Sequence, residues 1–590
     1  MYYSAGNYEA FAKPKKIEGA NKVKAHIIGG GLAGLATAAF LIRDGQVPGK
    51  NIKIYEASKI LGGACDGIED PIKKFIFRGG REMENHFECL WDLYRSIPSL
   101  RIKDASVLDE FYWLNKEDPN SSLMRATKNR GSEPAYDGKD YGLSKKNIKE
   151  LIWLAMASED LLEDKKIEDF LSQDFFKTNF WMFWRTMFAF EEWHSALEMK
   201  RYVLRFIHHI GGIHDFSVLK FTRYNQYESL IQPLVAWLKG HGVQYVYDAK
   251  ATNVIFKITD SQKTAKSLEL ILKGKKTSID LNGDLIFITN GSCTENSSLG
   301  DHSHPAILND SPVAPSWDMW KNIAKQSSEF GCPEKFCSHI PETKWESASV
   351  YVRNPAVIKR IKEITKRDPL SGRVVSGGIS TVRDSSWLMS WCCNRQPQFQ
   401  KQPAGTLMVW LYGLFTDAKG DYTHKSIQES TGQEIAKEWL YHIGFSEKEI
   451  EEYSKEESVH VIPCMMPYIT AFFMPRKKTD RPLVVPNGST NFAFIGQFAE
   501  TPRDCIFTTE YSVRTAMEAT YKLLNVDRGI PEVFGSCYDA RWILNSFTVL
   551  TNGKGLDKLP LIGKIVAKKV IKHNNKNMIG ELAKEFGISK

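Results

Sequence analysis

The chain has 590 residues, a formal net charge of +8, 42% hydrophobic residues and 25% charged residues. This length is too great for one hydrophobic core, so we expect several domains and favour an enzyme. No stretch approaches the roughly eighteen uninterrupted apolar residues of a membrane span, and the N-terminus lacks a signal-peptide core, so we expect a cytoplasmic protein. The 10 cysteines show neither a disulfide framework nor metal-ligand spacing, which predicts reduced thiols and no metal site.

The first predicted elements are a strand, a tight turn and a helix over residues 22–43, with Gly29, Gly31 and Gly34 forming a Gly-x-Gly-x-x-Gly pattern. These glycines permit the turn, let backbone N–H groups approach a pyrophosphate, and let the helix pack closely on the strand. A second strand ends at Glu56, about twenty residues further on, where a carboxylate can bond ribose hydroxyls. The segment therefore predicts a Rossmann-like nucleotide-binding domain rather than a chance glycine loop.

The stretch over residues 77–91 begins with two glycines between Arg78 and Arg81, which are followed at once by acidic residues. Glycines let a backbone lie close to a flat ring or a phosphate. A salt-bridged turn is the alternative interpretation. The second half of the stretch is predicted to be helical and to end before Pro98.

Residues 144–171 and 179–209 have helical patterns, and the second run is rich in Phe and Trp. An aromatic helix face usually packs in a core, but a pocket for a long acyl chain needs the same lining. Tyr202 lies between Arg201 and Arg205 on this predicted helix. A surface tyrosine beside cations and a tyrosine that takes part in chemistry both fit that pattern.

Later segments return to the nucleotide-binding sheet. We expect a helix over 226–239, strands over 243–246 and 250–256, a hairpin over 267–281, and a buried strand over 284–292. A further strand over 491–497 precedes a helix over 511–524, which Thr508 and Thr509 are expected to cap. Trp-rich, strand-like runs over 297–482 indicate a separate substrate domain.

Basic residues concentrate at the C-terminus, where residues 551–590 hold nine lysines and three acidic residues. Residues 559–572 mix apolar and cationic side chains at near-helical spacing. A docked helix and a helix on an anionic membrane surface both fit this pattern. The chain carries no nucleic-acid-binding motif, so we expect no nucleic acid partner.

Together these segments resemble the bacterial fatty acid double-bond hydratases, the oleate hydratase or myosin-cross-reactive antigen family. The most specific matches are the following: Met1 to Ser4, Arg78 to Met83, Asn85 to Leu93, Phe206 to Gly212 and Tyr224 to Tyr227. The resemblance implies FAD, a homodimer, and addition of water across the 9,10 cis double bond of free unsaturated fatty acids such as oleate or linoleate. The alternative is an FAD-dependent oxidoreductase or isomerase that acts on a lipid-like substrate.

The resemblance also implies an α/β fold with a discontinuous FAD-binding domain, a mixed α+β substrate domain, an aromatic-rich helical region and a helical C-terminal extension. The expected boundaries are 1–143, 220–296 and 485–525 for the FAD-binding domain, with an inserted lid segment in the first part, 144–219 for the helical region, 297–484 for the substrate domain, and 526–590 for the extension.

Site residues follow from the same resemblance. Tyr202 corresponds to the catalytic acid and Glu82 to the carboxylate that activates water. The expected FAD-binding residues are Gly29, Gly31, Gly34, Glu56, Gly63, Arg78, Arg81, Met83, Asn290, Gly291, Thr508 and Thr509. Gln497 stands where related flavoproteins commonly carry Asp.

The resemblance implies a polar end of the pocket that holds the fatty acid carboxylate. Gln226 and Asn394 match the expected residues there, whereas Cys392 replaces a common Thr and Gln398 replaces a common His. A thiol is a weaker hydrogen-bond donor than a hydroxyl, and Gln adds no positive charge. We therefore expect carboxylate binding to depend mainly on Gln226 and Asn394.

Overall fold

The computed structural model describes residues 13–65, 67–70, 74–80, 82–136 and 140–553. Arg81 and the predicted amphipathic segment over 559–572 lie outside the described residues. Among the described residues, no helix has both the length and the apolar character needed to cross a membrane.

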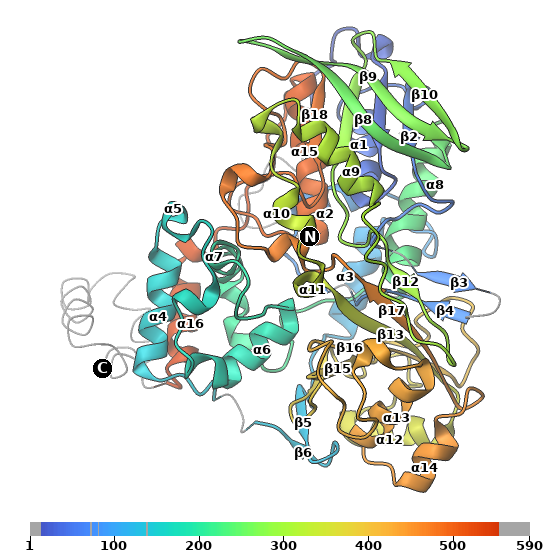
Figure 1. Ribbon diagram of the computed structural model, residues 1–590, viewed down its shortest axis with the longest axis vertical. Helices are drawn as coiled ribbons and strands as arrows, with labels where there is room; N and C mark the ends of the chain where they lie inside the picture. Colours follow the sequence, from blue (N-terminus) through green and yellow to red (C-terminus); the bar gives the residue numbers. More distant parts are fainter. Residues whose placement is uncertain (1–12, 66, 71–73, 81, 137–139, 554–590) are drawn as a thin grey trace.

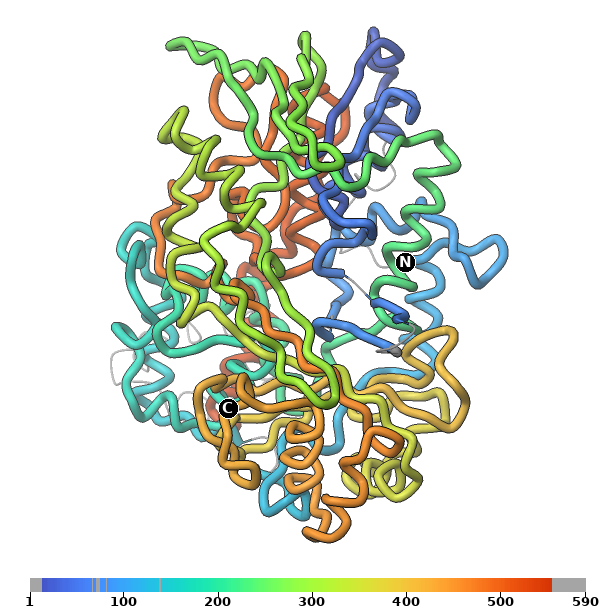
Figure 2. The backbone as a smooth tube through the Cα atoms, turned by 45° about the vertical axis from the view of Figure 1, so that its right-hand side comes forward, coloured from blue at the N-terminus to red at the C-terminus, as the bar shows by residue number. Residues whose placement is uncertain are grey.

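A five-stranded parallel sheet forms the nucleotide-binding part, which confirms the predicted α/β class (Figure 1). Short runs of apolar residues buried on both faces are typical of parallel strands. Across the sheet the order is β18 (Phe492–Ile495), β11 (Leu285–Thr289), β1 (Ala25–Ile28), β2 (Ile52–Tyr55) and β7 (Gln244–Val246). The chain thus contributes to this sheet from three widely separated segments, and Figure 2 shows the blue N-terminal segment beside the orange-red segment near residue 500.

Helix α1 (Leu32–Arg43) follows β1 and packs against α15 (Thr509–Leu524). Gly34 and Gly45 allow this close packing. A Cβ at Gly34 would lie 2.0 Å from the carbonyl oxygen of Gly29, and one at Gly45 would lie 2.7 Å from the side chain of Leu524. Helices α2 (Glu88–Tyr94) and α8 (Gln232–Gly240) pack against α1 as well.

Three antiparallel strands lie beside the parallel sheet: β8 (Ala249–Ile258), β9 (Lys263–Leu272) and β10 (Lys275–Asp280). The predicted hairpin over 267–281 is confirmed, with Gly274 at its turn in a left-handed conformation. Helix α9 (Pro315–Ala324) covers β8.

An eight-stranded sheet forms the second layer of the molecule (Figure 1). Its order is β12 (Ser298–Leu299), β17 (Val459–Met466), β13 (Trp345–Val352), β16 (Leu407–Gly413), β15 (Met389–Cys392), β14 (Ser380–Val382), β5 (Ala126–Lys128) and β6 (Glu133–Pro134). Successive side chains of a strand point to opposite faces. Trp410 and Tyr412 of β16 therefore face the large core that includes the parallel sheet, whereas Val409 and Leu411 face a separate core. The helices on that second side are α12 (Pro355–Thr365), α13 (Gly432–His442) and α14 (Glu447–Tyr453).

The helical region, at the left in Figure 1, is more broken than its sequence pattern predicted. Its helices are α4 (Lys145–Met156), α5 (Glu159–Leu162), α6 (Asn179–Phe188), α7 (Ala196–Arg205) and α16 (Ala540–Leu550). The prediction of a continuous helix over 144–171 was wrong, because the chain becomes extended at Ala157. The run over 179–209 is interrupted where Ala189 adopts a left-handed conformation and ends α6. Ser195 caps the next helix, α7, by accepting a hydrogen bond from the backbone N–H of Glu198.

The remaining regular elements are short or lie at the surface. They are β3 (Ile68–Asp70), β4 (Lys74–Ile76), α3 (Val107–Glu117), α10 (Glu334–Cys337) and α11 (Ile340–Thr343). The segment between β4 and α2, which contains Arg78 and Glu82, lies between the parallel sheet and the eight-stranded sheet and contributes to cavities on both sides.

Candidate active site

A cleft of about 750 Å³ opens at the carboxyl ends of the parallel strands. Gly29 follows β1, Glu56 follows β2, Gly291 follows β11 and Gly496 follows β18, and all four residues line the cleft. Ligands of doubly wound α/β sheets bind at this edge. Gly31 and Gly63 also line it, and a Cβ at Gly63 would lie 3.1 Å from the Cα of Gly31.

The turn after β1 requires glycine at two positions. Gly29 has a φ of 93°, a conformation that favours glycine, and a Cβ at Gly30 would lie 2.4 Å from Leu61. The Glu56 carboxylate accepts hydrogen bonds from the backbone N–H groups of Gly30 and Ser58, both at 2.8 Å. The carboxylate is thus held at the turn, and these residues fit the phosphates and ribose of a dinucleotide.

Helix α15 begins at the wall of the same cleft. Thr508 caps the helix by accepting a hydrogen bond from the N–H of Tyr511 at 3.1 Å. Gln497 stabilises this turn, because its side-chain amide donates to the carbonyl oxygen of Thr508 and to the Ser512 hydroxyl, both at 2.9 Å, and accepts from the N–H of Phe507. The residue that departs from the usual Asp therefore has a local structural role.

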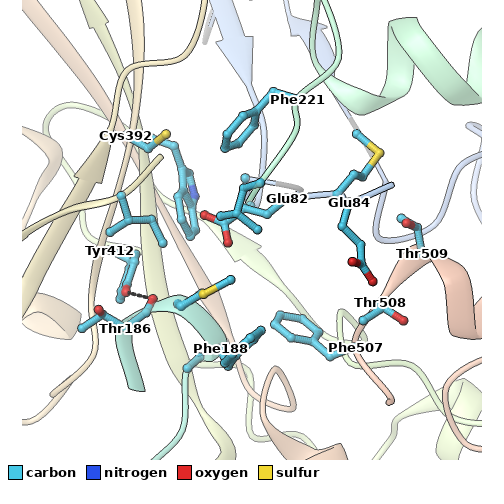
Figure 3. A pocket seen from close by; sticks show the side chains of 18 of the residues that line it. Glu82, Glu84, Thr186, Phe188, Phe221, Cys392, Tyr412, Phe507, Thr508 and Thr509 are labelled. Atoms are coloured by element: carbon cyan, nitrogen blue, oxygen red, sulfur yellow. Dashed lines mark hydrogen bonds between the residues drawn. The ribbon is translucent and has the colours of Figure 1, made fainter. Parts of the chain in front are cut away.

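A second cavity, shown in Figure 3, adjoins the cleft. Arg78, Phe507, Thr508 and Thr509 line both spaces. The Arg78 guanidinium donates to the carbonyl oxygen of Gly63 at 3.0 Å, so it bridges the two spaces. The walls of the second cavity are mainly apolar and aromatic: Met83, Phe87, Met187, Phe188, Phe206, Leu219, Phe221, Trp345, Ile379, Trp410, Ile469 and Phe507. Such a lining fits an apolar substrate.

Glu82 places a carboxyl group inside this cavity. Figure 3 shows the carboxyl turned toward the side formed by Cys392 and Tyr412. No described residue forms a hydrogen bond or an ion pair with it. Burial raises the pKa of Glu82 from 4.5 to about 8, although the charge of Arg125 opposes the shift.

Tyr202 lines the same cavity and is 1% exposed, which excludes the surface interpretation. Its hydroxyl donates to the carbonyl oxygen of Ile506 at 2.6 Å. The rings of Phe188 and Phe190 lie 4.9 and 5.0 Å from its ring. Burial among these groups raises the pKa of Tyr202 well above 10, so the phenol stays protonated at neutral pH.

The two arginines beside Tyr202 in the sequence form ion pairs with acidic residues. Arg201 pairs with Glu159 and Glu500, at 2.9 and 2.7 Å. Arg205 pairs with Glu84 at 2.8 Å and donates to the carbonyl oxygen of His86 at 2.7 Å. Arg205 therefore joins the helix that carries Tyr202 to the segment that carries Glu82.

Glu84 strengthens this connection. Its carboxylate also contacts His208 and His209, at 2.7 and 2.9 Å. Burial alone would raise the pKa of Glu84, but Arg205 and the two histidines hold it well below its ordinary value. Sequence reasoning missed this role of Glu84, and the adjacent histidines in the segment over 206–212 were the signal that could have indicated it.

The four residues expected at the substrate carboxylate lie in two pairs. Cys392 lines the cavity, and its thiol donates to the Asn394 side chain at 3.1 Å. Gln226 donates to the carbonyl oxygen of Gly79 at 3.3 Å. Gln398 lies beside Gln226, because the backbone carbonyl oxygen of Gln398 accepts a hydrogen bond from the N–H of Asn225, the preceding residue, at 2.9 Å. Of these four residues, Cys392 is the one that lines the described cavity.

Three described residues expected at the cofactor lie outside the walls of the nucleotide cleft. Gly34 is buried in helix α1, where it packs against Gly29. Met83 lines the aromatic cavity instead. Asn290 is buried behind the cleft and donates to the carbonyl oxygen of Phe498 at 3.2 Å.

Two groups in the described part of the chain hold three potential metal ligands each: Glu84 with His208 and His209, and Asp421 with Glu438 and His442. The first carboxylate already pairs with Arg205. In the second group, Glu438 accepts hydrogen bonds from the backbone of Asp421, Tyr422 and Thr423. Both sets of ligands therefore have protein partners.

A nucleotide cleft that adjoins an aromatic cavity lined by a carboxyl group and a buried phenol defines a Rossmann-type enzyme acting on an apolar substrate. The chain belongs to the MCRA family, whose model matches residues 22–521. It is 50% identical over 592 residues to an oleate hydratase of Streptococcus pyogenes serotype M49 (strain NZ131), with 100% of both chains covered. A linoleate hydratase of Lactiplantibacillus plantarum is 29% identical over 541 residues, which cover 86% of this chain and 94% of that protein.

Among solved structures, putrescine oxidase bound to putrescine matches with a TM-score of 0.47 and 13% sequence identity. The match covers 85% of this chain and 99% of that one.

Glu82→Gln is expected to be more stable than the wild type above about pH 8. Folding raises the pKa of Glu82 from 4.5 to about 8. The free energy of unfolding of the wild type is therefore highest at low pH, where Glu82 is protonated, and falls as the pH rises through this range. The loss is at most about 1.4 kcal/mol per pH unit. Urea unfolding of both proteins across this range measures it, and a difference that does not change with pH would contradict it.

Proposed function

We propose that this protein is a fatty acid hydratase. It adds water across a cis double bond, the 9,10 bond, of free unsaturated fatty acids such as oleate or linoleate and yields hydroxy fatty acids. One observation supports this function most directly. Glu82 and Tyr202 line one aromatic cavity, in a chain that is similar over its whole length to an oleate hydratase.

The chemistry needs a proton donor and a group that binds water. An isolated alkene is a very weak base, so proton transfer to carbon requires a donor held against it. The Tyr202 phenol is that donor, and its O–H turns from the carbonyl oxygen of Ile506 toward the substrate. Glu82, in its ionised form, orients the attacking water, accepts its proton and stabilises positive charge on the neighbouring carbon.

The nucleotide cleft is proposed to bind FAD. Gly29, Gly31 and Gly63 line its walls, and the carboxylate of Glu56 is held at the glycine turn by the N–H of Gly30. The proposed ligand residues are Gly29, Gly31, Gly34, Glu56, Gly63, Arg78, Arg81, Met83, Asn290, Gly291, Thr508 and Thr509. Hydration involves no net redox change, so bound FAD supplies electrostatic support and order to the segment over 78–83.

The fatty acid carboxylate is proposed to bind near Gln226, Cys392, Asn394 and Gln398. The Cys392 thiol donates to Asn394 and leaves the Asn394 amide group to act as a donor. This arrangement lacks a cation, so the substrate is held by hydrogen bonds and by the apolar walls. We further propose a homodimer, and contact of the basic tail with the inner face of an anionic membrane.

The reaction is tested by incubating the holoenzyme with oleate. We expect a product heavier by one water, formed without consumption of an electron acceptor. Reduction of an acceptor in proportion to product would instead establish an oxidoreductase, and a product of unchanged mass would establish an isomerase.

Tyr202→Phe is expected to lower turnover by about 10²- to 10⁴-fold while FAD binding is kept, because the variant lacks only the proton donor. Tyr94→Phe is the matched control, since the Tyr94 hydroxyl is also buried and donates to a backbone carbonyl oxygen, that of Leu230, at 3.0 Å. Oleate turnover of both variants is measured. Equal losses in the two variants would refute the assigned role of Tyr202.

Glu56→Ala is expected to weaken FAD binding, because the variant loses the ribose ligand and the contacts that hold the glycine turn. Flavin absorbance retained by the protein after gel filtration measures the effect. Glu133→Ala, which changes an exposed glutamate outside the cleft, is the control. Full flavin retention by Glu56→Ala would exclude this residue as a ligand.

A further inference from the structure

Arg125 is a fully buried arginine that directly precedes β5 and lies behind Thr186 and Ile379, two residues that line the aromatic cavity. Its guanidinium donates to the Thr186 hydroxyl at 2.8 Å and to the Thr381 hydroxyl at 3.1 Å. Two further hydrogen bonds go to the carbonyl oxygens of Phe183 and Ile379, at 3.0 and 3.3 Å. The Nε–H group has no partner, and the ring of Phe216 lies 4.1 Å from the guanidinium carbon. All these neighbours are neutral.

This neutral environment distinguishes Arg125 from the other buried arginines. Within the described ranges, each of the others has a carboxylate oxygen within 4.0 Å: Arg201, Arg205, Arg395, Arg476, Arg481, Arg514 and Arg528. A buried cation without a carboxylate partner is costly. The fold nevertheless holds Arg125 in place with four hydrogen bonds, which indicates that its charge has a functional role.

Thr186 and Ile379, which accept hydrogen bonds from Arg125, line the same cavity as Glu82. The charge of Arg125 favours the ionised form of the Glu82 carboxyl and so lowers its pKa. Tyr412 and Cys392 also face Glu82, but burial raises the pKa of both, so they are neutral at neutral pH. Arg125 itself faces Tyr412, Tyr136 and Tyr141, whose pKa values are raised by burial as well.

The other charged groups of the cavity have partners of their own. Glu84 is paired with Arg205 and the two neighbouring histidines, and Arg78 is bonded to Gly63 and Ser297. Tyr202 is bonded to the carbonyl oxygen of Ile506. Within the described part of this site, Glu82 and Arg125 are therefore charged groups that have no oppositely charged partner within ion-pair distance.

We propose that Arg125 is a positioning residue of the hydration reaction, whose buried charge favours the ionised form of the Glu82 carboxyl in the aromatic cavity. The proposal rests on the proposed function, in which ionised Glu82 receives the proton of water. Thr186 connects Arg125 to the cavity wall. Its hydroxyl accepts a hydrogen bond from Arg125, and its carbonyl oxygen accepts one from the Tyr412 hydroxyl at 2.8 Å (Figure 3).

The direct test is the pH dependence of kcat/KM for oleate in wild type, Arg125→Gln and Arg125→Lys holoenzymes. Without the cation, ionisation of Glu82 requires a higher pH, so the acidic limb of the Arg125→Gln profile is expected to move up by about one pH unit. Activity then falls about tenfold on the acidic side and recovers toward the wild-type value at high pH. Arg125→Lys keeps a charge and is expected to move the limb less.

Arg528→Gln is the matched control. Arg528 is buried but is paired with Asp92, so its replacement is expected to lower stability and leave the acidic limb in place. A uniform loss of activity at every pH in Arg125→Gln, or an equal shift in Arg125→Lys, would overturn the proposal.

A second measurement needs no turnover. The cost of Arg125→Gln in the free energy of unfolding is measured in the wild type and in Glu82→Gln, at about pH 5 and about pH 9. We expect equal costs at the lower pH, where Glu82 is protonated, and a larger cost in the wild type at the higher pH. If Arg125→Gln does not fold, Arg125→Met, which also removes the charge, takes its place in the cycle. Absence of coupling at both pH values would overturn the role of Arg125, whereas a wild type that leaves oleate unchanged would refute only the proposed function.

Discussion

The structure of this site depends on the cost of ionising one carboxyl group, that of Glu82, inside a cavity walled by aromatic side chains. Water and protein dipoles normally stabilise a carboxylate, and an apolar wall keeps water away from it. The cavity nevertheless needs that wall to accommodate an apolar substrate. Among the described residues, Arg125 is a buried cation without a carboxylate partner, held behind the cavity wall by Thr186 and Thr381, whereas Glu84 is paired with Arg205.

This constraint explains how three parts of the chain meet. The eight-stranded sheet supplies Trp410 and Tyr412, the helical region supplies Tyr202, and the segment between β4 and α2 supplies Glu82. The ion pair of Arg205 with Glu84 joins the last two parts. Because buried ion pairs of this kind lose much when one partner is removed, they fix the position of the segment relative to helix α7.

The nucleotide-binding part could be predicted from the sequence because its rules are local. The spacing of Gly29, Gly31 and Gly34 and the position of Glu56 follow from one strand, one turn and one helix. Tyr202 and Glu82 were assigned by resemblance, and their place in one cavity required the fold. Arg125 shows no local pattern, since its contacts lie 58 to 256 residues away along the chain. The ends of helices near 157 and 189 were also missed, because neighbouring aromatic residues hide the change in backbone conformation.

Infrared titration of the Glu82 carboxyl tests the central claim most directly. The difference spectrum between the wild type and Glu82→Gln isolates the C=O band of the protonated group, and its loss with rising pH gives the pKa of Glu82 without reference to turnover. The account predicts a midpoint near 8, with the band still present at neutral pH. A midpoint at the ordinary value of 4.5 would show that the carboxyl is solvated like a surface group, and would contradict the account.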